Sequence, residues 1–239
     1  MFNTGQDMRR GFAGWSGLAA ALMLLQGCGT PQFAEKEVRT VPYEVERSVV
    51  IPVTVTVELE AEIPELRRIV QPASDIGGDI AYPLSAGGAL SNALFAVTET
   101  YFEGVEQTAL RGDAPRVKYT LLEYNPEIRF EPGGVATTSY AAARLAIRAD
   151  LYRGPVRVLS TVVFGTGHVG DSKMLDRFGT GPALLEAATR DAIIDAMYEL
   201  SAFFDNNRET IGAGLNPPPP PPARRPFDDV VLYLEPRQR

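Results

Sequence analysis

The sequence predicts an α+β domain of two layers, in which an antiparallel β-sheet packs against two amphipathic helices. Apolar and polar residues alternate over 53–63, and apolar residues recur at helical spacing over 85–103 and 182–206. Short, turn-linked apolar runs lie between the two helical stretches. This order, with helices segregated from the strands, is typical of α+β proteins.

The first strand has the clearest pattern. Between Pro52 and Pro64, small or branched apolar residues alternate with threonine and glutamate. A period of two residues indicates a strand with one buried side and one solvent-facing side. Three glutamates on the polar side are typical of an edge strand that avoids pairing with other molecules. A turn is expected over 75–79.

The first helix is expected over 85–103, with Gly104 ending it. Its apolar stripe contains Leu90, Leu94, Val97 and Tyr101, which is the pattern of an amphipathic helix. The loop over 111–115 follows, and we interpret its Arg-Gly-Asp tripeptide as a turn.

Several strands are expected next. One covers 116–121 and is interrupted by Asn125-Pro126, another covers 141–151, and a tight connection over 153–155 leads to a return strand over 156–164. Turn-linked strands of this length form antiparallel hairpins. The polar residues of the second of these strands, expected to face solvent, are Arg144, Arg148 and Asp150.

The last helix is expected over 182–206, with Pro182 in the first turn. Glu186 and Arg190 are four residues apart, in the order that favours an ion pair. The expected buried stripe is Ile193, Met197, Leu200 and Phe204, and the expected solvent-facing stripe is Asp191, Asp195 and Glu199.

The chain after Gly212 reads as a linker. Six consecutive prolines over 217–222 predict a stiff polyproline rod of roughly 19 Å. Beyond the rod, 227–234 is apolar and rich in β-forming residues. We expect such a segment either to dock by adding a strand to a sheet edge, on the same chain or on a partner, or to remain disordered as chain ends often do.

The N-terminus has the pattern of an export signal, because Arg9 and Arg10 precede an apolar run over 11–25. That run has 15 residues, whereas a membrane-spanning helix needs roughly 20. Residues 25–28 (Leu-Gln-Gly-Cys) resemble the lipobox of a bacterial lipoprotein precursor. The resemblance implies lipid attachment, palmitate included, at Cys28 after removal of the signal. An uncleaved anchor or an ordinary buried thiol are the alternatives.

The expected organisation is a signal peptide over 1–27, a tether over 28–46, an α+β periplasmic domain over 47–212, and a Pro-rich linker and C-terminal tail over 213–239. Cys28 is the only cysteine, so no internal disulfide can form. The formal charge is −7, and removing the signal's net charge of +1 leaves −8. An acidic surface disfavours nucleic acid and anionic headgroups, so we expect the lipid to supply membrane attachment.

The order of elements over 53–206, the segment over 162–167 and the alanine-rich helix over 187–197 make the domain similar to small envelope lipoproteins of the YajG type. It is also similar in plan to penicillin-binding-protein activators and ABC-transport auxiliary lipoproteins. Gly29 follows the cysteine, which resembles the signal for release to the outer membrane in Gram-negative bacteria. Retention in the inner membrane stays an alternative.

Residues 165–170 form a G-x-G-x-x-G pattern after a strand. A dinucleotide site needs a helix directly after these glycines, but ten residues separate Gly170 from the expected helix. We therefore expect a flexible loop and no cofactor. His168, the only histidine, has Asp171 and Asp176 as its acidic neighbours, and we expect it to be an exposed loop residue with no metal.

Three functional hypotheses follow. The first is a non-enzymatic lipoprotein that binds or supports other envelope components through a protein partner. The second is an auxiliary subunit of an envelope transport system. The third is a cell-wall or glycan hydrolase that uses carboxylates, for which the candidates are Asp171, Asp176, Asp191 and Asp195.

The lipidation hypothesis makes a direct prediction. Cys28→Ser or Cys28→Ala should abolish lipid labelling and leave uncleaved precursor, because processing requires the modified cysteine. Metabolic labelling with a fatty acid and mass spectrometry of the N-terminus measure both effects. Maturation of the variant at residue 28, with continued membrane fractionation, would refute the hypothesis.

Overall fold

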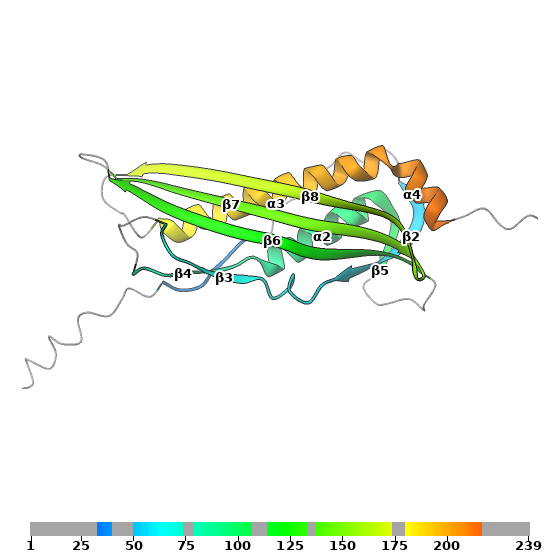
Figure 1. Cartoon of the computed structure of the whole chain (residues 1–239), viewed down its shortest axis with the longest axis horizontal. Helices are drawn as coiled ribbons and strands as arrows, with labels where there is room; N and C mark the ends of the chain where they lie inside the picture. Colours follow the sequence, from blue (N-terminus) through cyan, green and yellow to red (C-terminus); the bar gives the residue numbers. More distant parts are fainter. Residues whose placement is uncertain are drawn as a thin grey trace, which may run out of the picture.

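The computed structural model describes residues 33–39, 50–73, 79–106, 114–132, 137–173 and 180–216. These segments form two β-sheets and three helices (Figure 1), which confirms the α+β class. The elements are β1 (Lys36–Glu37), β2 (Ile51–Leu59), β3 (Arg67–Val70), β4 (Tyr82–Ser85), α2 (Gly87–Tyr101), β5 (Phe102–Glu106), β6 (Pro115–Pro132), β7 (Thr137–Arg153), β8 (Val156–Lys173), α3 (Gly181–Asn206) and α4 (Arg208–Leu215).

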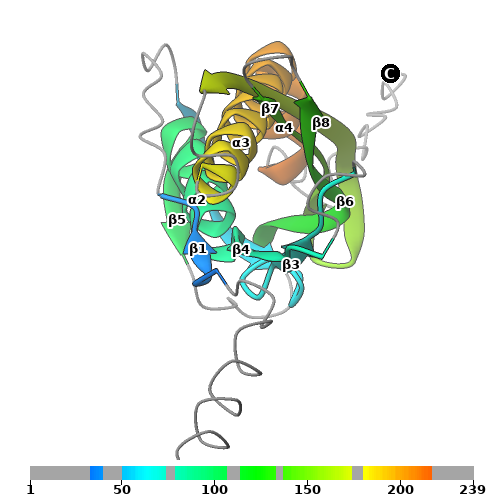
Figure 2. The same ribbon diagram turned by 90° about the vertical axis from the view of Figure 1, so that its left-hand side faces the viewer.

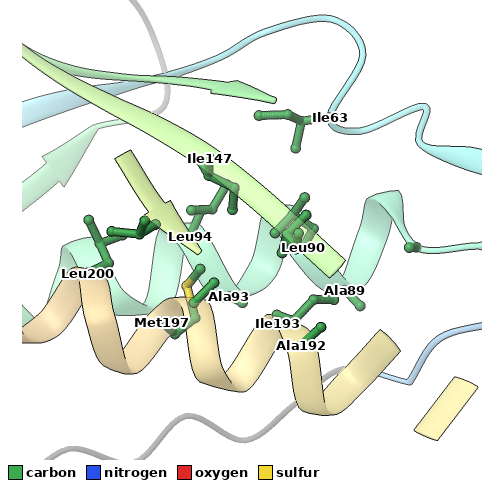
Figure 3. Close-up of a cluster of buried hydrophobic side chains, with 14 of the residues drawn as sticks. Ile63, Ala89, Leu90, Ala93, Leu94, Ile147, Ala192, Ile193, Met197 and Leu200 are labelled. Carbon is green, nitrogen blue, oxygen red and sulfur yellow. The ribbon is translucent and has the colours of Figure 1, made fainter. Parts of the chain in front are cut away.

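The larger sheet has the strand order β5-β2-β6-β7-β8, and the smaller one has the order β1-β4-β3. In the end-on view, the long strands curve around α3 (Figure 2). Apolar side chains from α2 and α3 meet beneath β7 (Figure 3), where Leu94, Met197 and Ile147 are each at most 1% exposed. The two apolar stripes expected for the helices are therefore confirmed.

The position of β2 corrects the expected edge strand. It lies inside the sheet and pairs in parallel with β5 on one side and β6 on the other. The sheet is therefore mixed, because α2 carries the chain back so that β5 starts at the same end as β2. Gly104 lies within β5 and not at the helix end. Glu58 forms ion pairs with Lys118 and Arg116 on β6.

The strands β6, β7 and β8 are longer than expected, with 18, 17 and 18 residues. β6 continues through Asn125-Pro126 and has only an irregularity between Leu121 and Glu123. The Ile128 carbonyl accepts a hydrogen bond from Ala73 on the side away from β7. The nitrogen of Pro126, two residues earlier, faces that same side, so the proline removes no hydrogen bond to β7.

Tyrosine hydroxyl groups connect the helices to the sheet and to each other. Tyr119 on β6 and Thr98 on α2 have hydroxyl oxygens 2.7 Å apart, and Tyr124 on β6 lies 3.0 Å from the hydroxyl of Thr189 on α3. Burial raises the pKa of Tyr124 to about 12. The Tyr101 hydroxyl donates to Asp205 over 2.8 Å and thereby joins α2 to α3.

Both ends of the described domain extend beyond the expected boundaries. Part of the expected tether forms β1, which pairs with β4, and Phe33 packs on Tyr82 with ring centroids 4.9 Å apart. At the other end, α4 continues past Gly212 to Leu215, whose side chain is buried. Cys28 and the tail over 227–239 lie outside the described residues.

The contact between α3 and β8 depends on two glycines. A Cβ atom at Gly165 would overlap the carbonyl oxygen of Ala192, and one at Gly167 would overlap the carbonyl oxygen of Ala188. The backbone of α3 thus lies directly on β8 at these positions. Ala196, one turn further along α3, also lies against Gly165.

We predict that Gly167→Ala destabilises the domain by roughly 1–3 kcal/mol, because the helix must move away from the strand. Gly88→Ala in α2 is the matched control, since its Cβ would lie 3.8 Å from the Glu37 carboxylate, at an ordinary contact distance. Thermal unfolding of both variants measures the difference. Equal melting temperatures would show that the close contact is unnecessary.

Candidate functional site: the open face of the long strands

The strands β6, β7 and β8 present their alternate side chains away from the helices. We call this surface the open face. Its central residues are Glu123, Asn125, Glu127 and Arg129 of β6, Tyr140, Ala142, Arg144, Ala146 and Arg148 of β7, and Val162, Phe164, Thr166, His168 and Gly170 of β8, as the strand registers define. Phe164 is 57% exposed, Tyr140 43% and Val162 39%. Exposed aromatic and branched side chains on one sheet surface are a feature of interaction sites.

A shallow depression of about 200 Å³ lies at one end of the open face. Glu127, Tyr140, Ala142, His168 and Gly170 are among the residues that line it. A second depression of about 340 Å³ adjoins it along the same face and shares Glu127, Tyr140, Ala142 and His168 with it. Together they offer a place for a side chain of a docked partner.

His168 is exposed, as expected, but it lies in β8 and not in a loop. The segment over 165–170 is extended and pairs with β7 throughout, so the flexible loop expected there is wrong. Its first two glycines admit the backbone of α3 on the core side of the strand. The space that a pyrophosphate would need beside these glycines is occupied by the helix.

The hairpin end of the same face carries a buried carboxylate. Asp150, expected to face solvent, has a side chain only 3% exposed. It accepts a hydrogen bond from the Ser160 hydroxyl over 2.6 Å and pairs with Arg148 at 3.1 Å and Arg157 at 3.5 Å. The side chain points away from the helices, but its partners cover it, and this corrects the expectation. The network joins β7 to β8.

Cationic side chains outnumber carboxylates at the end of the open face where β7 turns into β8. Arg148 and Arg157 share Asp150, while Arg116 and Lys118 share Glu58 of the adjoining β2. Each carboxylate thus faces two cations. Glu106 of β5, opposite Thr56 on β2, adds a third carboxylate on the same side of the sheet. The four cations and three carboxylates leave a net charge of +1 here, although the whole chain has a formal charge of −7.

The carboxylates of α3 have a structural role at the free edge of β8. Asp195 accepts hydrogen bonds from the Thr166 amide at 2.9 Å and from its hydroxyl at 3.2 Å. Glu199 accepts one from the Phe164 amide at 2.8 Å. These bonds satisfy backbone N–H groups that would otherwise be open to another strand.

The other candidate carboxylates differ in what the structure shows of them. Asp191 pairs with Arg190 at 3.7 Å. The side chain of Asp171 and all of Asp176 lie outside the described residues. Glu186 pairs with Lys36 and Arg39, which corrects the expected pair with Arg190. Among the described residues, no group of three or more His, Cys, Asp or Glu side chains is placed to hold a metal ion.

Sequence reasoning missed the open face, because it ended the return strand at Phe164 and treated the following glycines as a loop. A signal was present: larger residues alternate with glycine from Phe164 to His168. With the glycines assigned to the helix side, the larger residues fall on the opposite side, as the structure places them.

None of the described helices is long and apolar enough to cross a membrane. No family model and no curated protein matches the chain.

Among solved structures, a minor lipoprotein from Acinetobacter baumannii is similar at 14% identity and a TM-score of 0.38, over 67% of this chain and 96% of that one. A Xanthomonas campestris protein of family model DUF330 has 17% identity and a TM-score of 0.41, over 72% and 94%. A Helicobacter pylori protein titled a putative neuraminyllactose-binding hemagglutinin homolog has 10% identity and a TM-score of 0.40, over 75% and 99%. Similarity at this level identifies neither a family nor a function.

Protection of the edge can be tested at Asp195. We predict that Asp195→Ala accelerates amide hydrogen exchange at Thr166, because its N–H loses its acceptor, and promotes association through the exposed edge. Asp191→Ala is the control on the same helix, since Asp191 makes only a surface ion pair with Arg190 in the described residues. Unchanged exchange at Thr166 in Asp195→Ala would contradict the assigned role.

Proposed function

We propose that the protein is a non-enzymatic lipoprotein of the cell envelope, anchored through lipid on Cys28, which binds another envelope protein through the open face. The N-terminal pattern supports the anchor, with the only cysteine of the chain placed at the processing site. Gly29 supports release to the outer membrane, where the domain would face the periplasm.

The observation that carries the binding role is the exposure of Phe164, Tyr140 and Val162 on one sheet surface, with charged side chains around them. Aromatic residues surrounded by polar groups supply much of the binding energy at protein interfaces. The shallow depression over Ala142 provides a place for a partner's side chain.

If the partner belongs to a transport assembly, the protein is an auxiliary subunit of it. The open face would then be the surface that binds the assembly. Hydrolysis through Asp195 has less support, because its carboxylate is already bonded to the backbone and hydroxyl of Thr166. Asp150 is likewise paired with two arginines and a serine.

The proposal is tested in intact cells that produce the lipidated protein. Phe164→Ser removes an exposed aromatic side chain from the open face, and Tyr198→Ser on α3 removes one with the same 57% exposure elsewhere. After cross-linking and detergent extraction, we expect Phe164→Ser to reduce recovery of a specific partner by about tenfold, as loss of a central aromatic contact does. Tyr198→Ser should recover it normally.

Both variants should keep lipid labelling and the parental melting temperature, which separates lost binding from lost folding. Equal recovery of every cross-linked protein by the two variants would overturn the role of the open face.

A further inference from the structure

We infer that the C-terminal segment 227–235 of the chain docks on the open face of its own domain. The inference rests on the proposed use of this face as a binding surface and names an occupant for it. Three features of the described residues support this: where the chain leaves the domain, what charge the receiving surface carries, and which part of the sheet is blocked.

The chain leaves the described domain beside β8. Gly214, next to the end of α4, packs against the side chain of Val158. Ten residues, 217–226, separate the described residues from the segment, and seven of them are proline. At about 3.1 Å per residue an extended linker of that length spans about 30 Å.

The receiving surface lies within that span. α4 and Val158 pack on the core side of the sheet, so the linker first passes around the free edge of β8, about 5–10 Å, and then runs about 20 Å along the strand from Val158 to Phe164. The segment itself, if extended, covers a further 25–30 Å or so, which is enough to pass from Val162 to the depression beside His168. A linker of matched length raises the local concentration of a tethered segment to about the millimolar range, so weak contacts suffice for docking.

The chemistry of the segment matches that of the surface. Its sequence, Phe-Asp-Asp-Val-Val-Leu-Tyr-Leu-Glu, has three carboxylates and no cation. On the open face, the first end that the chain reaches is the one where Arg148, Arg157, Arg116 and Lys118 share two carboxylates. Next along β8 are the exposed Val162 and Phe164, which suit the valine, leucine and tyrosine that follow the two aspartates.

The face is a better receptor than the adjoining edge of β8. The Phe164 and Thr166 amides already donate to Glu199 and Asp195, so a strand added there would have to displace both carboxylates. The segment is therefore expected to lie across the sheet surface through side-chain contacts and not to extend the sheet at that point, where strand addition to an edge was the expectation from sequence.

The experiment uses the mature chain 28–239 with Cys28→Ser, which removes the lipid and the only native cysteine, and with Val231→Cys carrying a nitroxide label. His168 is the only histidine in the chain, so its ring resonances report on the open face without overlap. We expect the oxidised label to remove most of the His168 signal intensity and the reduced label to restore it. Retained intensity in the oxidised sample would overturn the inference.

Charge provides the matched variants. Asp228→Lys combined with Asp229→Lys should restore most of the His168 intensity in the labelled protein, whereas Arg237→Glu, outside the segment, should leave the loss unchanged. An equal loss in both would overturn the claimed charge match. The melting temperature of each variant, measured alongside, separates lost docking from lost folding.

Mixing isotope-labelled protein without nitroxide and unlabelled protein with nitroxide identifies the molecule that supplies the segment. Loss of His168 intensity in this mixture, at the level seen in the single sample, would mean docking on a second copy and would overturn docking within one chain. An undisturbed signal in the mixture supports it. Failure of the inference would leave the partner recovery experiment with Phe164→Ser unaffected, because that experiment measures another molecule.

Discussion

The contact between the backbone of α3 and β8 is the constraint on which the rest of the domain depends. Gly165 and Gly167 lack the side chains that would hold the helix away from the strand, and the alanines at 188, 192 and 196 form the facing side of the helix at a spacing of four residues. A seam of small residues brings two backbones close together, and it fixes the helix along the strand because any larger side chain would overlap.

Two properties of the surface follow from that seam. With the helix so close, Asp195 and Glu199 reach the edge amides of β8, so the edge is satisfied without another strand. The residues that alternate with the glycines, Phe164, Thr166 and His168, then lie on the other side of the strand. The same pattern that packs one side of the strand therefore exposes an aromatic residue and a histidine on the other.

Local periodicity was sufficient to predict both helices with their buried stripes and the inward side of β7, because each depends on residues close together in the chain. The interior position of β2 was beyond such reasoning, since its neighbours β5 and β6 follow more than 40 residues later. Glycines at 165 and 167 hid the strand pattern of β8. Pro126 suggested a break in β6, but none is needed, because the nitrogen of Pro126 faces the side of β6 that does not pair with β7. The open face could not be located before the side covered by α3 was known. The prediction of lipid attachment at Cys28 uses only a local sequence pattern, and Cys28 lies outside the described residues.

The parallel pairing of β2 also affects how the chain folds while it is synthesised from the N-terminus onward. β2 has no partner until α2 and β5 have followed it, and its second partner β6 comes later still, so its apolar face stays uncovered while more than 40 further residues appear. Pairing over such a separation carries a loop-closure cost and slows folding compared with a local hairpin. The hairpins of β6, β7 and β8 form from adjacent segments, and they provide the template on which the earlier strand is finally placed. A chain interrupted before β5 would present β2 as an unpaired apolar strand, prone to aggregation.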